Sequence, residues 1–228
     1  MAPFVNVSKE NVHVVPESIS IKEAALVEPL SVAWHAVRQS GLKQGDRALV
    51  IGSGPIGALV TRVLKAQGAQ WVGVSEPTKV RSEIAHKCGA DAVYNPMQDD
   101  VVAKVKEATG GLGVDVAIDC AGNQRTLDAA IAACRKRGKI VMVALWSKPA
   151  QVDMQQLVMT EKSITASCCF NSQDTIEVLD ALDTKRIRVE DLVTGVIDLG
   201  DIMPKGIDAL TNEQHHIKIL VDLTKEKV

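Results

Sequence analysis

A glycine-rich turn between a short apolar run and a helical stretch constrains the fold of this chain most. Ala48–Ile51 is a run of four apolar residues, and Gly52, Gly54 and Gly57 follow it in the spacing G-x-G-x-x-G. A helical pattern then continues to about Gln67. In a strand–turn–helix unit of this kind, the first glycine permits the tight turn and the second lets a ligand approach the backbone. The third lets the helix pack closely on the strand, so a β-α-β unit is expected here.

The alternation of apolar runs and helical stretches continues along the chain. Further strands are predicted at 71–75, 114–119, 139–145 and 163–170, and further helices at 78–87, 101–109, 124–135 and about 172–184. A strand is also expected at Val12–Val15 and one long helix at Ile21–Ser40. Continuous apolar runs joined by helices are typical of buried parallel strands. Right-handed crossovers between them predict an α/β fold with a doubly wound parallel sheet.

Charge and composition exclude several classes of protein. The 228 residues contain 26 Lys and Arg against 28 Asp and Glu, and only 3% are aromatic, so neither a basic face nor base stacking is available for nucleic acid. No apolar stretch approaches the roughly 20 residues that span a bilayer, and the N-terminus does not resemble a signal peptide. The five cysteines lack C-x-x-C spacing, which favours a reducing compartment. A cytoplasmic protein that contacts neither nucleic acid nor membrane is therefore predicted.

The glycine turn predicts a dinucleotide site. Pro55 and Ile56 open the following helix, whose N–H groups and dipole suit phosphates. Glu76 lies 19 residues beyond the third glycine, where an acid accepts hydrogen bonds from ribose hydroxyls and repels a 2′-phosphate. This position favours NAD over NADP, although the nearby Lys79 and Arg81 weaken the preference. The alternative is that Glu76 is only a solvated acid at the start of a helix.

Six segments spread over nearly the whole chain are more specific together than any one motif. They are Ala25–Ala36 (ALVEPLSVAWHA), Val50–Gly57 (VIGSGPIG), Val74–Pro77 (VSEP), Asp115–Gly122 (DVAIDCAG), Val143–Pro149 (VALWSKP) and His216–Val221 (HIKILV). Together they resemble the medium-chain zinc-dependent alcohol dehydrogenase family, in its 2,3-butanediol and sorbitol dehydrogenase branch. The resemblance implies a Rossmann domain that binds NAD.

The resemblance also implies roles for individual residues. Glu76 matches the ribose-binding acid, and Arg81 matches a basic residue beside the adenosine. Cys120–Gly122 match the strand end along the adenosine-side ribose, whereas Val143–Leu145 and the backbone of Ser167–Cys169 match segments that hold the nicotinamide carboxamide. The full predicted set of cofactor residues is Gly52, Gly54, Pro55, Ile56, Gly57, Glu76, Arg81, Cys120, Ala121, Gly122, Val143, Ala144, Leu145, Ser167 and Cys169.

The departure from the family concerns zinc. Family members begin with a catalytic domain that carries a cysteine ligand, a Gly-His-Glu ligand pair and a four-cysteine structural zinc loop. This sequence has no Gly-His-Glu and no cysteine before Cys88. Because catalytic zinc takes three protein ligands, no zinc is expected. Glu28 matches the glutamate of a Glu-Pro pair at the catalytic zinc, and His35 lies seven residues on along the same helix face. These two are the candidate catalytic residues.

The expected organisation has three parts. Residues 1–30 are a remnant of the catalytic domain, 31–170 an NAD-binding Rossmann domain, and 171–228 a C-terminal α+β segment. Val152–Met159 is expected to be an edge strand, and the resemblance implies that this edge pairs with its symmetry mate in a homodimer. Cys168 and Cys169 are expected to be buried strand cysteines, with a redox-active pair as the alternative.

Three functions remain open at this stage. The favoured one is a truncated, zinc-free NAD(H)-dependent oxidoreductase that transfers hydride to or from a small alcohol or ketone, or an activated, enone-like substrate. The second is an NAD-binding pseudoenzyme or dimer partner without turnover. The third is a non-redox isomerase or cyclase on the same scaffold. The oxidoreductase is favoured because of the resemblance, since the sequence itself contains no complete set of catalytic residues.

Overall fold

A computed structural model describes residues 5–212 and 216–224 of the chain. The chain divides into two compact units. The larger comprises Pro29–Phe170, and the smaller combines residues 1–28 with residues 171–228. No helix within the described ranges is long and apolar enough to cross a membrane.

The larger unit is built around a six-stranded sheet in which every neighbouring pair of strands is parallel. The strand order is β3-β2-β1-β4-β5-β6, which confirms the predicted doubly wound Rossmann-type fold. The strands are β1 (Arg47–Ile51), β2 (Trp71–Ser75), β3 (Ala92–Tyr94), β4 (Val114–Asp119), β5 (Cys134–Met142) and β6 (Ser163–Ala166). The helices are α2 (Val27–Ser40), α3 (Pro55–Ala66), α4 (Lys79–Lys87), α5 (Val101–Ala108), α6 (Gln124–Ala133) and α7 (Met154–Thr160).

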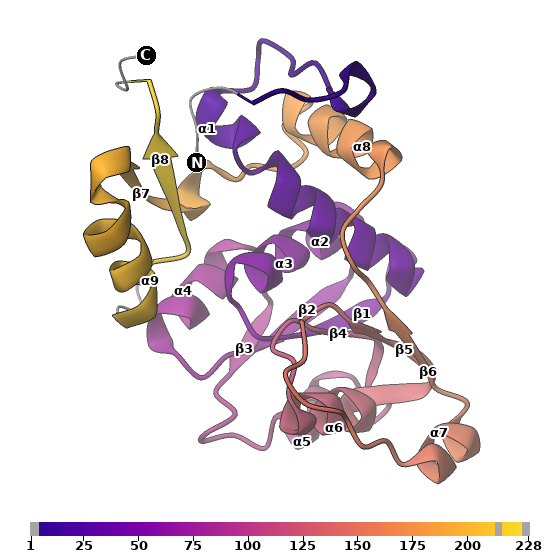
Figure 1. Cartoon of the computed structure of the whole chain (residues 1–228). Helices are drawn as coiled ribbons and strands as arrows, with labels where there is room; N and C mark the ends of the chain where they lie inside the picture. Colours follow the sequence, from indigo (N-terminus) through magenta and orange to yellow (C-terminus); the bar gives the residue numbers. More distant parts are fainter. Residues whose placement is uncertain (1–4, 213–215, 225–228) are drawn as a thin grey trace. The chain divides into compact units, whose positions relative to one another are not determined.

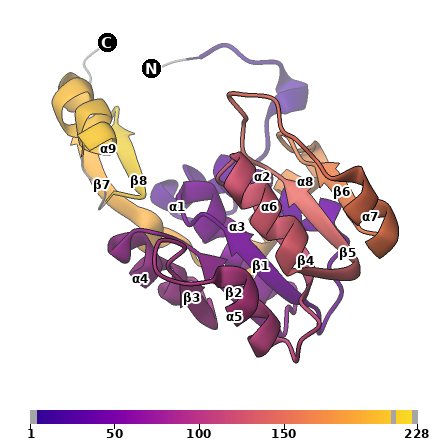
Figure 2. The ribbon, with the colours of Figure 1, turned by 90° about the horizontal axis from the view of Figure 1, so that it is seen from below.

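Helices cover both faces of the sheet. Figure 1 shows α2 and α3 on one side and α5 and α6 on the other, and Figure 2 views the sheet with α5 and α6 in front. Leu49 of β1 belongs to a buried cluster that includes Val105 of α5 and Leu127 of α6. Because successive strand side chains point to opposite faces, Val50 faces the other layer, where Leu59 of α3 is also buried. The central strands β1, β2 and β4 are therefore buried on both faces along most of their length.

The smaller unit contains short helices and a two-stranded parallel sheet. Its elements are η1 (Lys9–Asn11), α1 (Ile21–Ala24), α8 (Ser172–Asp183), η2 (Glu190–Leu192), β7 (Val193–Asp198), η3 (Leu199–Asp201), the π-helix η4 (Ile202–Ile207), α9 (Asp208–Asn212) and β8 (Lys218–Asp222). Capping boxes fix two of the helix starts. Ser20 pairs with Glu23 at α1, and Asn171 pairs with Asp174 at α8. That this unit is part of a catalytic domain stays a prediction.

The predicted edge strand at Val152–Met159 is wrong. This segment contains the helix α7, and the edge of the sheet beyond β5 is β6. The side chain of Asp153 accepts a hydrogen bond from the backbone N–H of Gln156 and so caps the helix. Met, Gln and Leu then supply good helix formers, which outweigh the apolar pattern that suggested a strand.

Other differences concern short or exposed segments. Val12–Val15 forms no strand, and the predicted helix at Ile21–Ser40 is two helices, α1 and α2, separated by a turn. The strand β3 has only three residues and was not predicted. Propensity is a weak guide over such short windows, because packing decides their conformation.

A substitution at Gly57 tests the contact between α3 and the turn after β1. A Cβ atom at this position would lie 1.9 Å from the carbonyl oxygen of Gly52, so α3 would have to shift. We expect Gly57→Ala to lower the free energy of unfolding by about 1–3 kcal/mol, as overpacking usually does. Urea unfolding measures this loss.

Gly54→Ala is the matched control in the same turn. Gly54 has no atom within 4 Å of a Cβ position and a φ of −70°, so alanine fits without a clash. We expect a loss below about 1 kcal/mol, which reflects only the poorer N-cap. Equal losses in both variants would contradict the proposed packing role of Gly57.

Candidate functional site

The strand order reverses between β1 and β4. β2 and β3 continue from β1 in one direction, and β4, β5 and β6 extend in the other. In open parallel sheets, ligands bind in the crevice beyond the carboxyl ends of the strands at such a point. Here the backbone N–H of Cys120 donates to the carbonyl of Ile51 at 2.9 Å. A Cβ at Gly52 would lie 3.2 Å from the Cβ of Ala121. The structure therefore brings the glycine turn and the end of β4 together.

The glycine turn has the geometry of a phosphate-binding loop. Gly52 has a φ of +89°, which favours glycine, and its N–H donates to the carbonyl of Ser75 at 2.8 Å. Gly54 is the N-cap of α3, and Pro55 occupies the first helical position before the half-buried Ile56. No side chain in the described ranges caps this helix, and a Cβ at Gly54 would enter open space. The first-turn N–H groups of α3 thus face a position where an anion can bind.

Glu76 lies beside this turn, at the end of β2. Its side chain is only 2% exposed, and its carboxylate accepts a hydrogen bond from the backbone N–H of Ser53 at 2.8 Å. The other oxygen accepts from the N–H and the hydroxyl of Thr78, at 2.9 and 2.7 Å. A carboxylate has about four acceptor positions, so three are used within the protein and one remains for a ligand hydroxyl. The second role of Glu76, holding β2 to the turn, was missed by the sequence analysis, which considered a ligand-binding acid or a solvated acid; the side chain is buried and not solvated.

The loop after β4 is held by a buried carboxylate. One oxygen of Asp119 accepts from the N–H groups of Ala121 and Gly122, at 2.8 and 3.1 Å, and the other accepts from the Thr126 hydroxyl at 2.9 Å. Asp119 itself is fully buried. Cys120 is half-buried, and burial of its thiol, followed by the charge of Asp119, raises the pKa of the thiol far above the usual range. Cys120 therefore contributes backbone to the site and not a nucleophile.

The loop after β5 lies against the loop after β4. The N–H groups of Val143 and Ala144 both donate to the carbonyl of Asp119, at 2.9 and 3.2 Å. A Cβ at Gly122 would lie 2.7 Å from the Cβ of Ala144, so only glycine fits there. Leu145 follows with its side chain fully open to solvent. Asp119 thus connects the two predicted cofactor segments, Cys120–Gly122 and Val143–Leu145. The sequence analysis did not predict this role, because the only sign of it is an acid at the end of a strand, shortly before a glycine.

The end of β6 completes the row of strand ends. Ser167 is buried, and its N–H donates to the carbonyl of Met142 at 2.9 Å, which places it beside the end of β5. Cys168 and Cys169 follow and are both exposed, so the expectation of buried strand cysteines is wrong. The strand stops at Ala166, and the chain leaves the sheet before these residues.

Three buried polar atoms in the larger unit have no hydrogen-bond partner among the described residues. They are the hydroxyls of Ser53 and Ser167 and the Nε of Arg81. Buried polar groups are normally satisfied, so each such atom needs an explanation. Ser53 belongs to the glycine turn, Arg81 to the helix after Glu76, and Ser167 to the end of β6. The hydroxyl, phosphate and carboxamide groups of a dinucleotide would supply suitable partners.

A cavity of about 760 Å³ opens at the same strand ends, lined by the segments after β1, β2, β3 and β4 and by residues of α5 and α6. Its lining includes Gly52, Ser75, Pro77, Ala121 and Asn123, all at or just after strand ends. The volume is within the usual range for a small-molecule site. The site residues therefore fit a nucleotide at this edge of the sheet.

The two predicted catalytic residues lie on α2. Glu28 is exposed, and His35 is half-buried, with its Nε2 3.2 Å from the side-chain nitrogen of Gln39. Glu28 ends the N-terminal segment of the smaller unit, and Pro29 begins the larger unit. Neither residue belongs to the network of hydrogen bonds at the strand ends described above. A catalytic role for this pair stays a prediction.

The donor set for zinc is incomplete within the described residues. No three His, Cys, Asp or Glu side chains come together in residues 5–212 and 216–224. Structural zinc takes four protein ligands and catalytic zinc takes three, so these residues do not fit a zinc ion.

Comparison with known proteins agrees with this architecture. The family of zinc-binding dehydrogenases matches residues 55–184. The (R,R)-butanediol dehydrogenase of Neisseria gonorrhoeae is 37% identical over 220 residues, which cover 96% of this chain and 62% of that protein. The (R,R)-butanediol dehydrogenase of Bacillus subtilis is 38% identical over 218 residues, with the same coverage. The chain thus spans about three fifths of the length of these relatives.

Solved structures give the same result. The crystal structure of 2R,3R-butanediol dehydrogenase from Bacillus subtilis superposes with a TM-score of 0.86 at 37% identity, covering 91% of this chain and 59% of that chain. An alcohol dehydrogenase from Escherichia coli CFT073, crystallised with NADH, superposes with a TM-score of 0.88 at 27% identity, covering 95% and 64%. The strand order, the glycine turn and these similarities lead to one conclusion: this chain belongs to the zinc-binding dehydrogenase family.

Proposed function

We propose that this chain binds NAD(H) at the carboxyl ends of its parallel strands and serves an oxidoreductase that interconverts a small alcohol and ketone. The observation that carries the proposal is the glycine turn, where Gly57 packs on Gly52 and leaves Gly54 open beside the uncapped start of α3. When bound, nicotinamide supplies the hydride that is exchanged with substrate carbon. The relatives named butanediol dehydrogenase favour a small vicinal diol or hydroxyketone as substrate.

The residues of the larger unit would bind and orient the cofactor. The start of α3 would hold the pyrophosphate, because helix N-termini favour anions. Glu76 would use its remaining acceptor position for a ribose hydroxyl, with Arg81 close by on α4. Val143–Leu145 and Ser167–Cys169 would hold the carboxamide and so fix which face of the nicotinamide meets the substrate. Orientation of this kind is the protein's own contribution to hydride transfer.

A calorimetric titration with NADH and NADPH, followed by an assay of NADH oxidation, tests the proposal. The assay uses diacetyl and acetoin as ketones and a simple enone as the activated alternative, with the zinc content of the same sample measured. We expect NADH to bind more tightly than NADPH, and the ketones to be reduced. Binding without turnover would favour an NAD-binding role without redox activity. Absence of NADH binding would refute the proposal.

Glu76 tests the preference for NAD over NADP. We expect Glu76→Gln to lower the ratio of NADH to NADPH affinity by about 10-fold or more, since hydrogen bonds to charged groups contribute about 1.5–3 kcal/mol. The amide also removes the charge that repels a 2′-phosphate. The ratio is the informative quantity, because the substitution also weakens the bonds to Ser53 and Thr78 and so affects both cofactors.

Glu83→Gln is the matched control for this experiment. Glu83 is an exposed acid on α4, and its substitution removes the same charge seven residues further along. We expect an unchanged affinity ratio. An unchanged ratio in Glu76→Gln would exclude the ribose role and leave Glu76 as a residue that only holds the turn.

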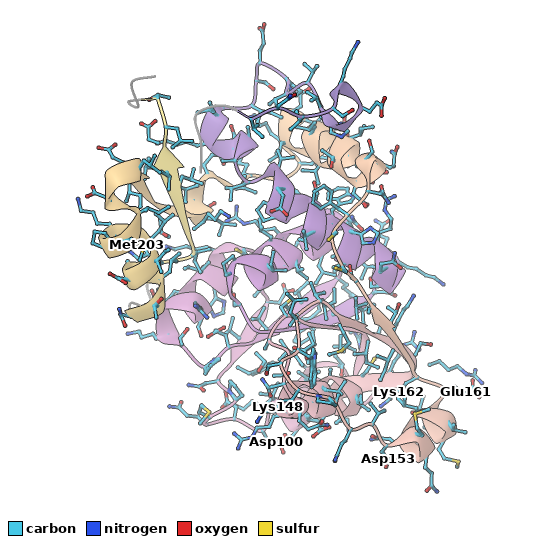
Figure 3. The ribbon with its side chains drawn as sticks, in the orientation of Figure 1. Asp100, Lys148, Asp153, Glu161, Lys162 and Met203 are labelled. Atoms are coloured by element: carbon cyan, nitrogen blue, oxygen red, sulfur yellow. The ribbon has the colours of Figure 1, made fainter. Side chains whose placement is uncertain are left out.

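We further propose that the protein is a homodimer formed through β6 and α7. β6 is an edge strand of the larger sheet, and open edges of this kind invite pairing. Met154, Val158 and Met159 of α7 are each more than half exposed. Figure 3 labels Asp153 and Glu161 at the two ends of this helix. Glu161 pairs with Arg137 at 2.7 Å, which ties α7 to β5.

Val158→Glu on α7 tests the dimer. We expect this charge to shift the protein towards monomer in sedimentation equilibrium, because burying an unpaired carboxylate in an interface is costly. Leu112→Glu is the control, since Leu112 and Val158 are both 69% exposed and Leu112 lies in the turn before β4. An equal response of both variants, or of neither, would argue against an interface at α7.

A further inference from the structure

Two adjacent cysteines lie side by side on the surface just after β6. Cys168 and Cys169 are both exposed, and no disulfide joins them. Their Sγ atoms are 3.6 Å apart. Nothing in the nucleotide site requires this pair of side chains, because the predicted role of Cys169 there uses its backbone.

The backbone explains why the two thiols share one side. In an extended strand, successive side chains point in opposite directions, which would separate adjacent cysteines. Cys169 instead has a φ of +57°, in the left-handed region that few residues other than glycine adopt. This conformation departs from extended backbone and brings the Cys169 sulfur next to that of Cys168.

The separation of the sulfurs suits a bridging atom better than a direct bond. A disulfide needs sulfurs about 2.05 Å apart and Cα atoms about 4.4–6.8 Å apart. Adjacent Cα atoms across a trans peptide are only about 3.8 Å apart, so a bond between these two cysteines would be strained. An atom that bonds to both sulfurs needs them farther apart than in a disulfide and close enough to share one centre. The observed separation of 3.6 Å meets this condition.

We propose that Cys168 and Cys169 form a dithiol site for a thiophilic centre that binds both sulfurs at once, of the class of trivalent organoarsenicals. With an arsenoxide, both thiols lose their protons, two As–S bonds form, and the arsenic-bound oxygen leaves as one water. Arsenic stays trivalent, so no oxidant or reductant is needed. Both residues are exposed, as an incoming reagent requires.

The other cysteines do not compete for such a reagent. Cys88 and Cys134 are buried. Burial raises the pKa of the Cys134 thiol to about 11 and that of Cys120 further still. Thiolates are the reactive form, so at pH 8 only about one Cys134 thiol in a thousand is reactive. A reagent that needs two neighbouring thiolates should therefore select the pair after β6.

Phenylarsine oxide is the probe. We expect intact-mass spectrometry of the full chain to find one phenylarsenic adduct per chain, with loss of one water. A small dithiol should release the phenylarsenic group, whereas a monothiol at the same concentration of thiol groups should not. Two linked thiols gain about 10²-fold or more in affinity over two separate thiols. Release by the monothiol as readily as by the dithiol would overturn the proposal.

Single substitutions assign the adduct to the pair. We expect Cys168→Ser and Cys169→Ser each to weaken binding of phenylarsine oxide by about 10²-fold or more, since each leaves one exposed thiol. Cys120→Ala is the control and should keep the adduct. Wild-type affinity in either serine variant, or loss of the adduct in the control alone, would refute the site. The result does not depend on NADH binding, which is measured separately on the same variants.

Discussion

The contact between Gly57 and the carbonyl of Gly52 is the constraint on which the larger unit depends. No side chain fits between them, so α3 can lie directly on the end of β1. The turn thereby positions the start of α3 at the reversal in strand order, where the ends of β1 and β4 meet. The close packing of Gly57 on Gly52 also orients the first N–H groups of α3 outwards, towards a ligand.

Two buried carboxylates extend this arrangement along the row of strand ends. Glu76 joins the end of β2 to the glycine turn, and Asp119 fixes the loop after β4 while its carbonyl accepts from the loop after β5. Each carboxylate accepts several N–H or O–H groups, which is the condition for burying such a group at acceptable free energy. The loops that form the candidate site are thus held by acids and not by apolar packing alone.

Much of the larger unit was predictable, because long apolar runs and glycine spacing are strong local signals. The strands β1, β2, β4 and β5 and the helices between them follow such signals. The helix α7 was not predictable, because its exposed apolar residues give it the composition of an edge strand. Among the residues of the candidate site, the glycine turn and Glu76 were predicted from spacing. Asp119 was missed, because its role depends on N–H groups of its own loop and on a hydroxyl seven residues away.

The sequence by itself determined the β-α-β alternation, the glycine turn and the acid that follows β2, since each is encoded by residues close in the chain. Only the tertiary structure decided that Glu76 also binds the turn, that one aspartate connects two loops, and that Cys168 and Cys169 lie with their sulfurs 3.6 Å apart. The physical reason is the same in each case. Hydrogen bonds to backbone groups and a single left-handed residue depend on the path of the folded chain, which local pattern and propensity do not specify.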